Sequence, residues 1–213
     1  MAPYNAVERP VTTREHWQGV YKSKAPTDVS WYAARLEESL RLIRDVTSPK
    51  ARIIDVGGGA STLVDDLVAL GYDDLTVLDV SEAALDVARK RLGIRGADVH
   101  WVAADVTTVE LEKDRFDLWH DRAAFHFLTS ASDRQAYVER GRRSLVAGGY
   151  VVIGTFAMNG PARCSGLDVV RYDVDSLSHE FGSDFTVTGQ LQATHITPAG
   201  REQHFVFCCL RKR

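Results

Sequence analysis

The sequence lacks the features that would point to a membrane, a nucleic acid or secretion. Its longest apolar runs have the length of a strand, well short of the ~20 residues of a transmembrane helix. The net charge is −3, so no global positive field attracts nucleic acid. The first residues show no basic-then-apolar signal pattern. We therefore expect neither a membrane nor a nucleic acid as partner.

Cysteine is scarce, and its placement suits neither a disulfide framework nor a metal. The chain has three cysteines, and Cys208 and Cys209 are adjacent, a spacing at which disulfides rarely form. No pair of cysteines or histidines has the two-residue spacing of a structural zinc site. The sequence predicts free thiols in a reducing cytoplasm and no metal site.

The chain contains no internal repeat and no low-complexity tract. Its 213 residues, 45% of them hydrophobic, are enough for one sizeable core. We expect a single compact domain in which residues 1–46 form an N-terminal segment with a helix and residues 47–213 form the main α/β body.

Short apolar runs alternate with amphipathic stretches, which is typical of an α/β fold with a mostly parallel sheet and helices on both faces. The expected strands cover residues 52–56, 75–79, 99–103, 116–119, 150–156, 185–195 and 203–210. The expected helices cover residues 33–46, 62–70, 82–92, 133–145 and 174–181. Because a short turn joins the last two strands, they must form an antiparallel hairpin.

A glycine-rich turn follows the first strand, and such a turn lets a ligand approach the backbone closely. The turn reads Asp55-Val56-Gly57-Gly58-Gly59. Asp79 ends the second strand, where its carboxylate can accept hydrogen bonds from two ribose hydroxyls. Asp105 follows the third strand, where it can meet an adenine amino group. These acids indicate a nucleoside ligand.

A dinucleotide site is the main alternative, because its fingerprint is Gly-x-Gly-x-x-Gly. Gly57 and Gly59 fit that fingerprint, but Thr62 stands at the third position. The carboxylate of Asp55 also repels a pyrophosphate, whereas it suits the ammonium of a methionine moiety. The pattern therefore favours S-adenosylmethionine over a nicotinamide or flavin dinucleotide, or over a tight turn that binds nothing.

At these residues the chain resembles the class I S-adenosylmethionine-dependent methyltransferases. Asp55, Gly57 and Gly59 match the first motif of that family, and Asp79 and Asp105 match its ribose and adenine acids. The resemblance covers the chain from position 51 onward. It implies a Rossmann-like, seven-stranded sheet of order 3-2-1-4-5-7-6 with strand seven antiparallel. It also implies S-adenosylmethionine as cofactor and S-adenosylhomocysteine as product.

Two segments have a narrower likeness to the thiopurine S-methyltransferase branch. They are residues 16–21 (His-Trp-Gln-Gly-Val-Tyr) and residues 116–124 (Phe-Asp-Leu-Trp-His-Asp-Arg-Ala-Ala). In that branch N-terminal aromatic residues cover the bound cofactor, which implies this role for Trp17 and Tyr21 here. We add Trp31 to this cover; the alternative is that these rings only pack the N-terminal segment on the sheet.

We expect the cofactor to contact the aromatic cover, the glycine turn, the acids with their neighbours, and a histidine after strand four. The expected cofactor-binding residues are Trp17, Tyr21, Trp31, Asp55, Gly57, Gly58, Gly59, Asp79, Val80, Ser81, Asp105, Val106 and His120.

The candidate catalytic residues follow the fourth strand, because ligands of open α/β sheets bind at the carboxyl ends of the strands. His126 is a candidate base near neutral pH, or else a packed histidine of the interior. Arg122 can pair with an anionic acceptor, or else form a surface ion pair. Asp121 can hold the methionine end of the cofactor or cap a helix. Cys164 lies in a loop that can cover the acceptor.

The leading hypothesis is a methyltransferase for a small-molecule nucleophile such as a thiol or related chalcogen, acting as a monomer or homodimer. The alternatives are a protein-lysine methyltransferase, which would need an open acidic groove, and a non-catalytic S-adenosylmethionine-binding module. A nucleic-acid amino-methyltransferase fits less well, because its Asn-Pro-Pro-Tyr-type motif is absent after strand four, where residues 120–122 read His-Asp-Arg.

Overall fold

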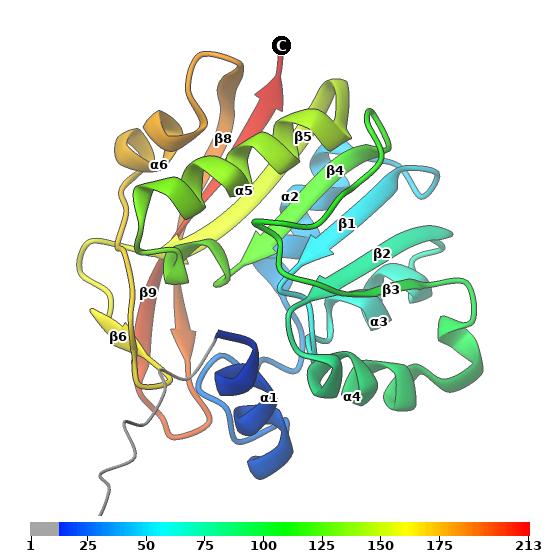
Figure 1. The fold of residues 1–213 in the computed structure, drawn as a ribbon, viewed down its shortest axis with the longest axis vertical. Coiled ribbons are helices and arrows are strands. Elements are labelled where there is room, and N and C mark those ends of the chain that lie inside the picture. Colours follow the sequence, from blue (N-terminus) through cyan, green and yellow to red (C-terminus); the bar gives the residue numbers. More distant parts are fainter. Residues whose placement is uncertain (1–12) are drawn as a thin grey trace, which may run out of the picture.

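A seven-stranded sheet forms the centre of the structure, a computed structural model that describes residues 13–213 (Figure 1). Its strands are β1 Arg52–Val56, β2 Asp74–Asp79, β3 His100–Ala103, β4 Phe116–Arg122, β5 Leu145–Phe156, β8 Phe185–Ile196 and β9 Glu202–Lys212. Their order is β3-β2-β1-β4-β5-β9-β8, and β9 runs antiparallel to both of its neighbours. Counted along this sheet alone, the order is the expected 3-2-1-4-5-7-6, so the predicted fold is confirmed.

Helices cover both faces of the sheet (Figure 1). They are α1 Thr13–Ser23, α2 Glu37–Val46, α3 Leu63–Ala69, α4 Glu82–Leu92, α5 Ala131–Ser144 and α6 Val174–Phe181, with the short 3-10 helices η1 Gly93–Gly96 and η2 Phe125–Phe127. One hydrophobic cluster joins α2, α3 and α4 to the sheet, and a second joins α5 and α6 to the opposite face. No helix among residues 13–213 is long and apolar enough to cross a membrane.

Helix α4 shows why local signals predict parts of this fold well. Ser81 caps it, because its hydroxyl oxygen accepts a hydrogen bond from the backbone N–H of Ala84. Basic residues fill the last turn, where they complement the helix dipole. Gly93 ends the helix with a φ of +55°, which glycine adopts without strain. The helix has the predicted bounds.

Three expected bounds were wrong. Strand β4 continues to Arg122, because residues beyond Trp119 still pair with β1 and β5. His120, Asp121 and Arg122 therefore lie in the strand and not after it. Strand β5 begins at Leu145, opposite Phe116, and not at 150.

The third corrected bound is the start of α2, which begins at Glu37 and not at 33. The backbone before it is held elsewhere: the carbonyl oxygen of Ala33 accepts a hydrogen bond from the Thr62 hydroxyl. This contact ties the segment before α2 to the region that follows the glycine turn.

The sequence did not predict every element. Helix α1 forms in the N-terminal segment, and a small antiparallel hairpin, β6 Arg163–Cys164 with β7 Leu167–Asp168, forms in the loop after β5. Residue Gln18 anchors α1, because its side-chain oxygen accepts hydrogen bonds from the Ser81 hydroxyl and the Ala83 backbone. Residues 1–12 of the expected N-terminal segment lie outside the described residues.

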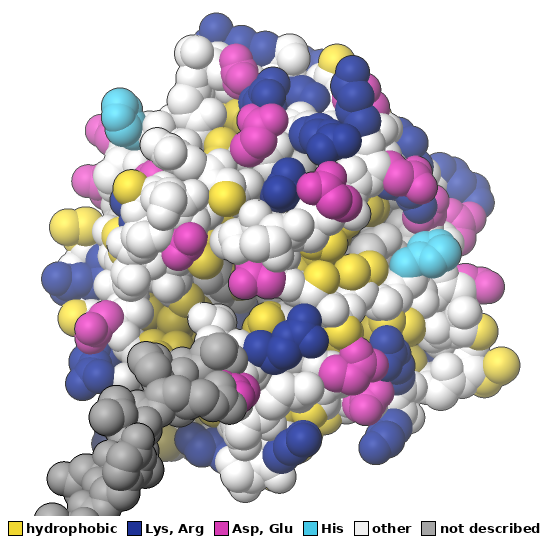
Figure 2. All heavy atoms as spheres, in the orientation of Figure 1, with side chains coloured by type: hydrophobic (Ala, Val, Ile, Leu, Met, Phe, Trp, Pro, Cys, Tyr) yellow, Lys and Arg dark blue, Asp and Glu magenta, His cyan; other side chains and the backbone are white. Residues whose placement is uncertain are grey.

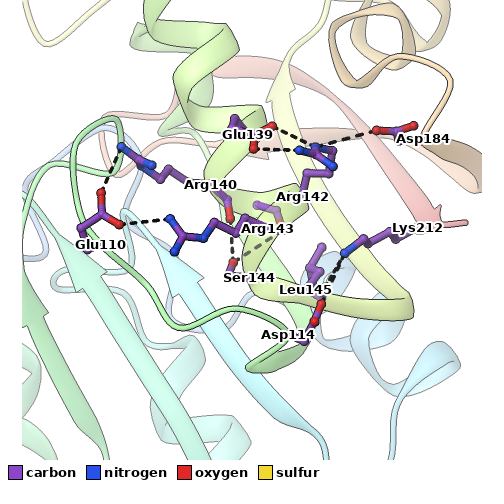
Figure 3. Close-up of polar contacts among 11 residues, drawn as sticks. Glu110, Asp114, Glu139, Arg140, Arg142, Arg143, Ser144, Leu145, Asp184 and Lys212 are labelled. Atoms are coloured by element: carbon purple, nitrogen blue, oxygen red, sulfur yellow. Dashed lines mark hydrogen bonds and ion pairs between the residues drawn. The ribbon is translucent and has the colours of Figure 1, made fainter.

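The amino-terminal edge of the sheet carries a network of paired charges (Figure 3). Glu110 pairs with both Arg140 and Arg143, while Arg142 pairs with Glu139. Figure 2 shows basic and acidic side chains intermixed on one face of the molecule. The cations of this network thus have neighbouring carboxylates, which leaves little basic surface there for a polyanion.

Candidate functional site

The glycine turn joins β1 to the segment before α3 and lies against β2. The backbone N–H of Gly57 donates to the carbonyl oxygen of Leu78 over 2.7 Å. Gly57 has a φ of +69°, and a Cβ there would collide with the side chain of Ala124. Only glycine therefore lets the turn lie this close to its neighbours.

Two cavities lie beside this turn. The larger one, of about 340 Å³, is the cofactor cavity, and the smaller one has about 40 Å³. Among the residues that line the cofactor cavity are Trp17, Tyr21, Trp31, Gly57, Asp79, Val80, Asp105, Val106, Arg122, Phe127, Phe156, Cys164 and Phe205. Expected residues that line the small cavity are Tyr21, Trp31, Asp55, Gly57, Gly58, His120 and Arg122. The structure thus brings most of the predicted residues together.

Asp79 is a buried carboxylate in the wall of the cofactor cavity. Burial raises its pKa to about 7, and the nearby Asp55 adds to the rise, while backbone hydrogen bonds from Ser81, Gly59 and Val80 oppose it. The Ser81 N–H donates to Asp79 Oδ1 over 2.8 Å. Close to neutral pH this carboxylate therefore changes between an acceptor-only and a donor form.

Gly59 and Ser81 do not line either cavity, although both were expected to touch the cofactor. A Cβ on Gly59 would collide with Asp79 Oδ2, and Ser81 is fully buried as the cap of α4. Both residues act on the position of the Asp79 side chain. Asp105 lines the cavity, and its Oδ1 accepts hydrogen bonds from the backbone and hydroxyl of Thr107.

Asp55 provides the test of whether the residues fit the expected cofactor. The residue is 4% exposed, and its Oδ2 is buried without a hydrogen-bond partner among the described residues. A buried carboxylate oxygen without a partner is costly, and a ligand ammonium would satisfy it. Asp55 lines the small cavity beside Gly58, so its charge and position fit the amino group of S-adenosylmethionine.

An aromatic cover lies over the cofactor cavity; it consists of Trp17, Tyr21, Trp31 and Phe127. Trp17 meets Trp31 and Phe127 edge to face, with ring centroids 5.6 and 4.9 Å apart. The Trp31 indole N–H donates to the Tyr21 hydroxyl over 3.1 Å. Burial raises the pKa of Tyr21 far above its usual range, so the phenol stays neutral. Such rings can exclude water and attract a sulfonium.

His126 does not reach either cavity. It is fully buried in η2, and its Nδ1 accepts a 3.3 Å hydrogen bond from the backbone of Phe156. Burial, with the charge of Arg122 adding to it, lowers its pKa to about 3. The structure therefore leaves this histidine neutral in the interior and away from any acceptor in the cavity.

Asp121 does not line either cavity. Its two oxygens accept hydrogen bonds from the backbone N–H groups of Ala124 and Phe125 and from the Tyr137 hydroxyl, over 2.9, 3.0 and 2.7 Å. Burial raises its pKa to about 6. The carboxylate thus joins β4 to η2 and α5, which is the capping alternative considered from the sequence.

Arg122 reaches the cavities, in contrast to its two predicted catalytic partners. Its side chain lines both, and its guanidinium donates to the Trp31 carbonyl oxygen over 3.0 Å and lies 4.9 Å above the Phe205 ring. Among residues 13–213 no carboxylate forms an ion pair with it. Burial lowers its pKa to about 10, so it is still a cation at neutral pH.

Several lining residues were missed from the sequence. Phe156 ends β5, so the rule that ligands lie at strand carboxyl ends could have found it. Phe205 lies near the start of β9, and an antiparallel strand brings its start to that same edge. Phe127 carried no signal, because its place in the cavity wall depends on how η2 packs.

The three cysteines are free thiols, as expected. Cys208 and Cys209 are buried in the cores on opposite faces of the sheet. Cys164 lines the cofactor cavity, with its Sγ 3.8 Å from the Ser30 hydroxyl. In the part of the chain that the structure describes, no group of three or more His, Cys, Asp or Glu side chains is arranged to hold a metal ion.

Comparisons with known proteins point to one enzyme family. The sequence profile of the methyltransferase domain matches residues 53–149. The eEF1A lysine and N-terminal methyltransferase of Mus musculus is 23% identical over 146 residues, which are 65% of this chain and 21% of that protein. The chain therefore spans about a fifth of the length of that relative.

A second relative matches almost end to end. The EEF1A lysine methyltransferase 2 of Homo sapiens is 23% identical over 212 residues, covering 91% of this chain and 83% of that protein. A solved structure has the same fold: the 1,6-didemethyltoxoflavin-N1-methyltransferase of Burkholderia thailandensis with bound 1,6-didemethyltoxoflavin and S-adenosylhomocysteine. Its TM-score is 0.68 at 18% identity, with 97% of this chain and 93% of that chain covered.

The likeness to the thiopurine branch stays a prediction, whereas the broader resemblance is confirmed. The profile match, the strand order and the glycine turn with its buried acids agree with one another. Residues 53–149 form a methyltransferase domain, and the chain has the fold of the class I S-adenosylmethionine-dependent methyltransferases, whose cofactor is S-adenosylmethionine.

Proposed function

We propose that this protein transfers the methyl group of S-adenosylmethionine to a small-molecule nucleophile, such as a thiol or a related chalcogen. One observation carries the choice of acceptor. Beyond the glycine turn, the cofactor cavity continues between Arg122, Phe156, Phe205 and Cys164. None of the lining residues from β4, β5, β6 or β9 is an aspartate or glutamate; the carboxylates that line the cavity, Asp79, Asp105 and Asp133, come from β2, the loop after β3 and α5. We call this end of the cavity the acceptor compartment.

The charge of the acceptor compartment favours a neutral or anionic acceptor. A lysine acceptor is a cation that must lose a proton before it can attack, and a nearby carboxylate helps that loss. Here the charged group is the guanidinium of Arg122, which instead stabilises an anion. A nearby cation lowers the pKa of a thiol and so favours the nucleophilic thiolate form. The compartment therefore suits a compact thiol better than an ammonium.

The roles of the other residues follow from the same geometry. When bound, S-adenosylmethionine supplies a sulfonium methyl group, which is already a strong electrophile. Asp55, Asp79 and Asp105 would hold the cofactor, while the aromatic cover keeps water from the cavity. Alignment of the acceptor is then the main task. His126 and Asp121 lie outside the cavities, so we assign the deprotonation of the acceptor to no side chain.

The same view gives the two parts of the chain separate roles. Residues 1–46 would cover the cofactor, with α1 supplying Trp17 and Tyr21, and residues 47–213 would bind the cofactor and acceptor. The free thiols favour a reducing compartment, which we propose to be the cytoplasm. We expect a monomer or a homodimer.

A protein-lysine methyltransferase is the second candidate. The names of the mouse and human relatives favour it, since both are called lysine methyltransferases. In this case the substrate lysine would have to enter the acceptor compartment next to Arg122. No carboxylate from β4, β5, β6 or β9 would be there to help it lose its proton. The two candidates therefore predict different products.

A label-transfer screen separates them. The full chain is incubated with S-adenosylmethionine tritiated in its methyl group and with thiols, halides, amines, phenols or cell-extract proteins, each in a separate reaction. The proposal predicts label in a small-molecule product, with thiols ahead of amines. Label that appears only in protein supports the second candidate, and the absence of transfer to any acceptor supports a non-catalytic module.

A further inference from the structure

The two carboxylate oxygens of Asp55 have different surroundings. Oδ1 lies 2.6 Å from Nδ1 of His120, whereas Oδ2 is buried without a partner among the described residues. A Cβ on Gly58 would collide with Oδ2, so this oxygen lies directly against the glycine turn. One oxygen is thus committed to the protein, and the other is left for a ligand.

His120 is held on its other side as well. Its Nε2 lies 2.9 Å from the hydroxyl of Ser39, a fully buried residue of α2. His120 itself is 1% exposed, and the pairing of β1 with β4 places it beside Asp55. A buried chain of hydrogen bonds therefore runs from α2 through β4 to the residue before the glycine turn.

A neutral imidazole satisfies both hydrogen bonds of this chain in one tautomer. The Ser39 hydroxyl donates to His120 Nε2, and His120 Nδ1–H donates to Asp55 Oδ1. In this arrangement the imidazole is neutral and Asp55 is an ionised carboxylate with one free oxygen. Because both ring nitrogens are engaged, the imidazole cannot rotate, and it fixes the rotamer of Asp55 before any ligand arrives.

We propose that His120 and Ser39 are positioning residues, which hold Asp55 so that Oδ2 receives the ammonium of the amino-acid moiety of the cofactor. The proposal rests on the proposed function, since it assumes that S-adenosylmethionine binds in these cavities. It goes further in naming two side chains that act through Asp55 and strengthen the binding of the amino-acid moiety alone.

The test compares two nucleosides that differ in this part. S-adenosylhomocysteine carries the amino-acid moiety, and 5′-deoxy-5′-methylthioadenosine lacks it. Calorimetry measures the Kd of both for the wild-type chain and for His120→Leu, His120→Asn and Ser39→Ala. Leucine removes both hydrogen bonds of the ring, asparagine keeps a donor near the Nδ1 position, and the alanine variant removes only the distal anchor.

The proposal predicts a selective loss. His120→Leu weakens S-adenosylhomocysteine about ten-fold or more, as expected when a buried charged group loses a hydrogen bond. His120→Asn and Ser39→Ala weaken it less, and all three variants bind methylthioadenosine as the wild type does. Should His120→Leu not fold, the other two variants still give the comparison.

Two results overturn the positioning role and leave the proposed function intact. One is an equal loss of affinity for both nucleosides, which indicates a general disturbance of the cavity. The other is unchanged affinity for S-adenosylhomocysteine in all the variants that fold. A wild-type chain that binds neither nucleoside contradicts the proposed function itself, and with it this inference.

Discussion

Asp79 combines a place in the cofactor cavity with a pKa of about 7. Only the ionised carboxylate accepts hydrogen bonds from both ribose hydroxyls, so the protonated fraction is not competent to bind. We predict that S-adenosylhomocysteine binds about ten-fold more weakly at pH 6 than at pH 8. Calorimetry across this range measures the effect, with Asp79→Asn as the matched control that removes the titration.

The same titration changes the stability of the fold in the opposite direction: as the pH rises, ligand binding strengthens but the contribution of Asp79 to stability falls. The folded pKa of Asp79 lies above the ordinary 3.8, so the folded chain binds this proton more tightly than the unfolded chain does. Its contribution to the free energy of unfolding therefore falls as the pH rises from about 4 to about 7. The ribose role of Asp79 is contradicted if the Kd of S-adenosylhomocysteine does not change with pH in the wild type. It is also contradicted if this Kd changes with pH in Asp79→Asn as it does in the wild type.

Arg122 is the one cation among the described residues that line the cofactor cavity. We predict that Arg122→Met lowers kcat/KM for a thiol acceptor by about 10- to 100-fold, the loss expected for a hydrogen bond to a charged group. Arg122→Lys keeps the charge and recovers part of the rate. Steady-state kinetics with the acceptor found by label transfer checks both; a Met variant as active as the wild type rejects the role.

The three acids lie at the cavities, where the sequence predicted them, whereas His126 lies outside both. Asp55, Asp79 and Asp105 follow apolar strands, and the carboxyl ends of parallel strands meet at one edge. His126 was placed by counting residues past an expected strand end at Trp119. Because β4 continues to Arg122, the chain bends inward later, and His126 is turned into the core.

Helix α1 covers the cavity but is weakly held, since its residues are at most partly buried. Its Gln18 contact with α4 is therefore a latch whose loss should speed cofactor release. We predict that Gln18→Ala raises the off-rate of S-adenosylhomocysteine about 3- to 10-fold, since two hydrogen bonds are lost. Stopped-flow displacement measures this rate.

The matched control for the latch is Gln18→Glu. A glutamate keeps the accepting oxygen and adds a negative charge next to the N-terminus of α4, where it is favourable. Its off-rate should stay close to that of the wild type. If the alanine and glutamate variants release the nucleoside at the same rate, the contact with α4 does not control release.

The junction of β4, η2 and α5 depends on Asp121. We predict that Asp121→Ala lowers the free energy of unfolding by about 3 kcal/mol, because three donors, two of them buried, lose their acceptor. Tyr137→Phe removes only one of these bonds and should cost less. Urea denaturation of both variants tests this, and a catalytic loss in Asp121→Ala without loss of stability contradicts the structural role.

The elements that local signals predict best are those with their own caps and apolar faces, such as α4 and the strands of the parallel core. Helix α1 was not predicted, because it is polar and depends on the contact of Gln18 with α4. The extension of β4 was missed because His120, Asp121 and Arg122 are polar, and only pairing on both sides holds them in a strand.

The two edges of the sheet differ across the whole molecule. At the amino-terminal edge, surface charges have partners: Glu110 with Arg140 and Arg143, and Lys212 with Asp114 (Figure 3). At the carboxyl edge, Asp55 Oδ2 is without a partner and Arg122 is without a paired carboxylate among the described residues. A buried carboxylate oxygen without a partner is costly, so Asp55 Oδ2 marks the carboxyl edge as the place where a bound cation would be stabilised.

The order of the sheet could be predicted from the alternation of strands and helices and from the closing hairpin, since these leave few possible connections. The extent of the acceptor compartment could not, because its walls come from residues as distant in sequence as Arg122, Cys164 and Phe205. Their meeting is a property of the assembled fold.

Calorimetric titration of the full chain with S-adenosylhomocysteine, and separately with NADH, tests the central claim most directly. We predict saturable binding of S-adenosylhomocysteine and none of NADH. Asp55→Ala and Asp79→Ala should each weaken the S-adenosylhomocysteine complex by roughly 1–3 kcal/mol through lost hydrogen bonds. Tight binding of NADH without binding of S-adenosylhomocysteine would contradict the account, and so would variants that bind S-adenosylhomocysteine as tightly as the wild type does.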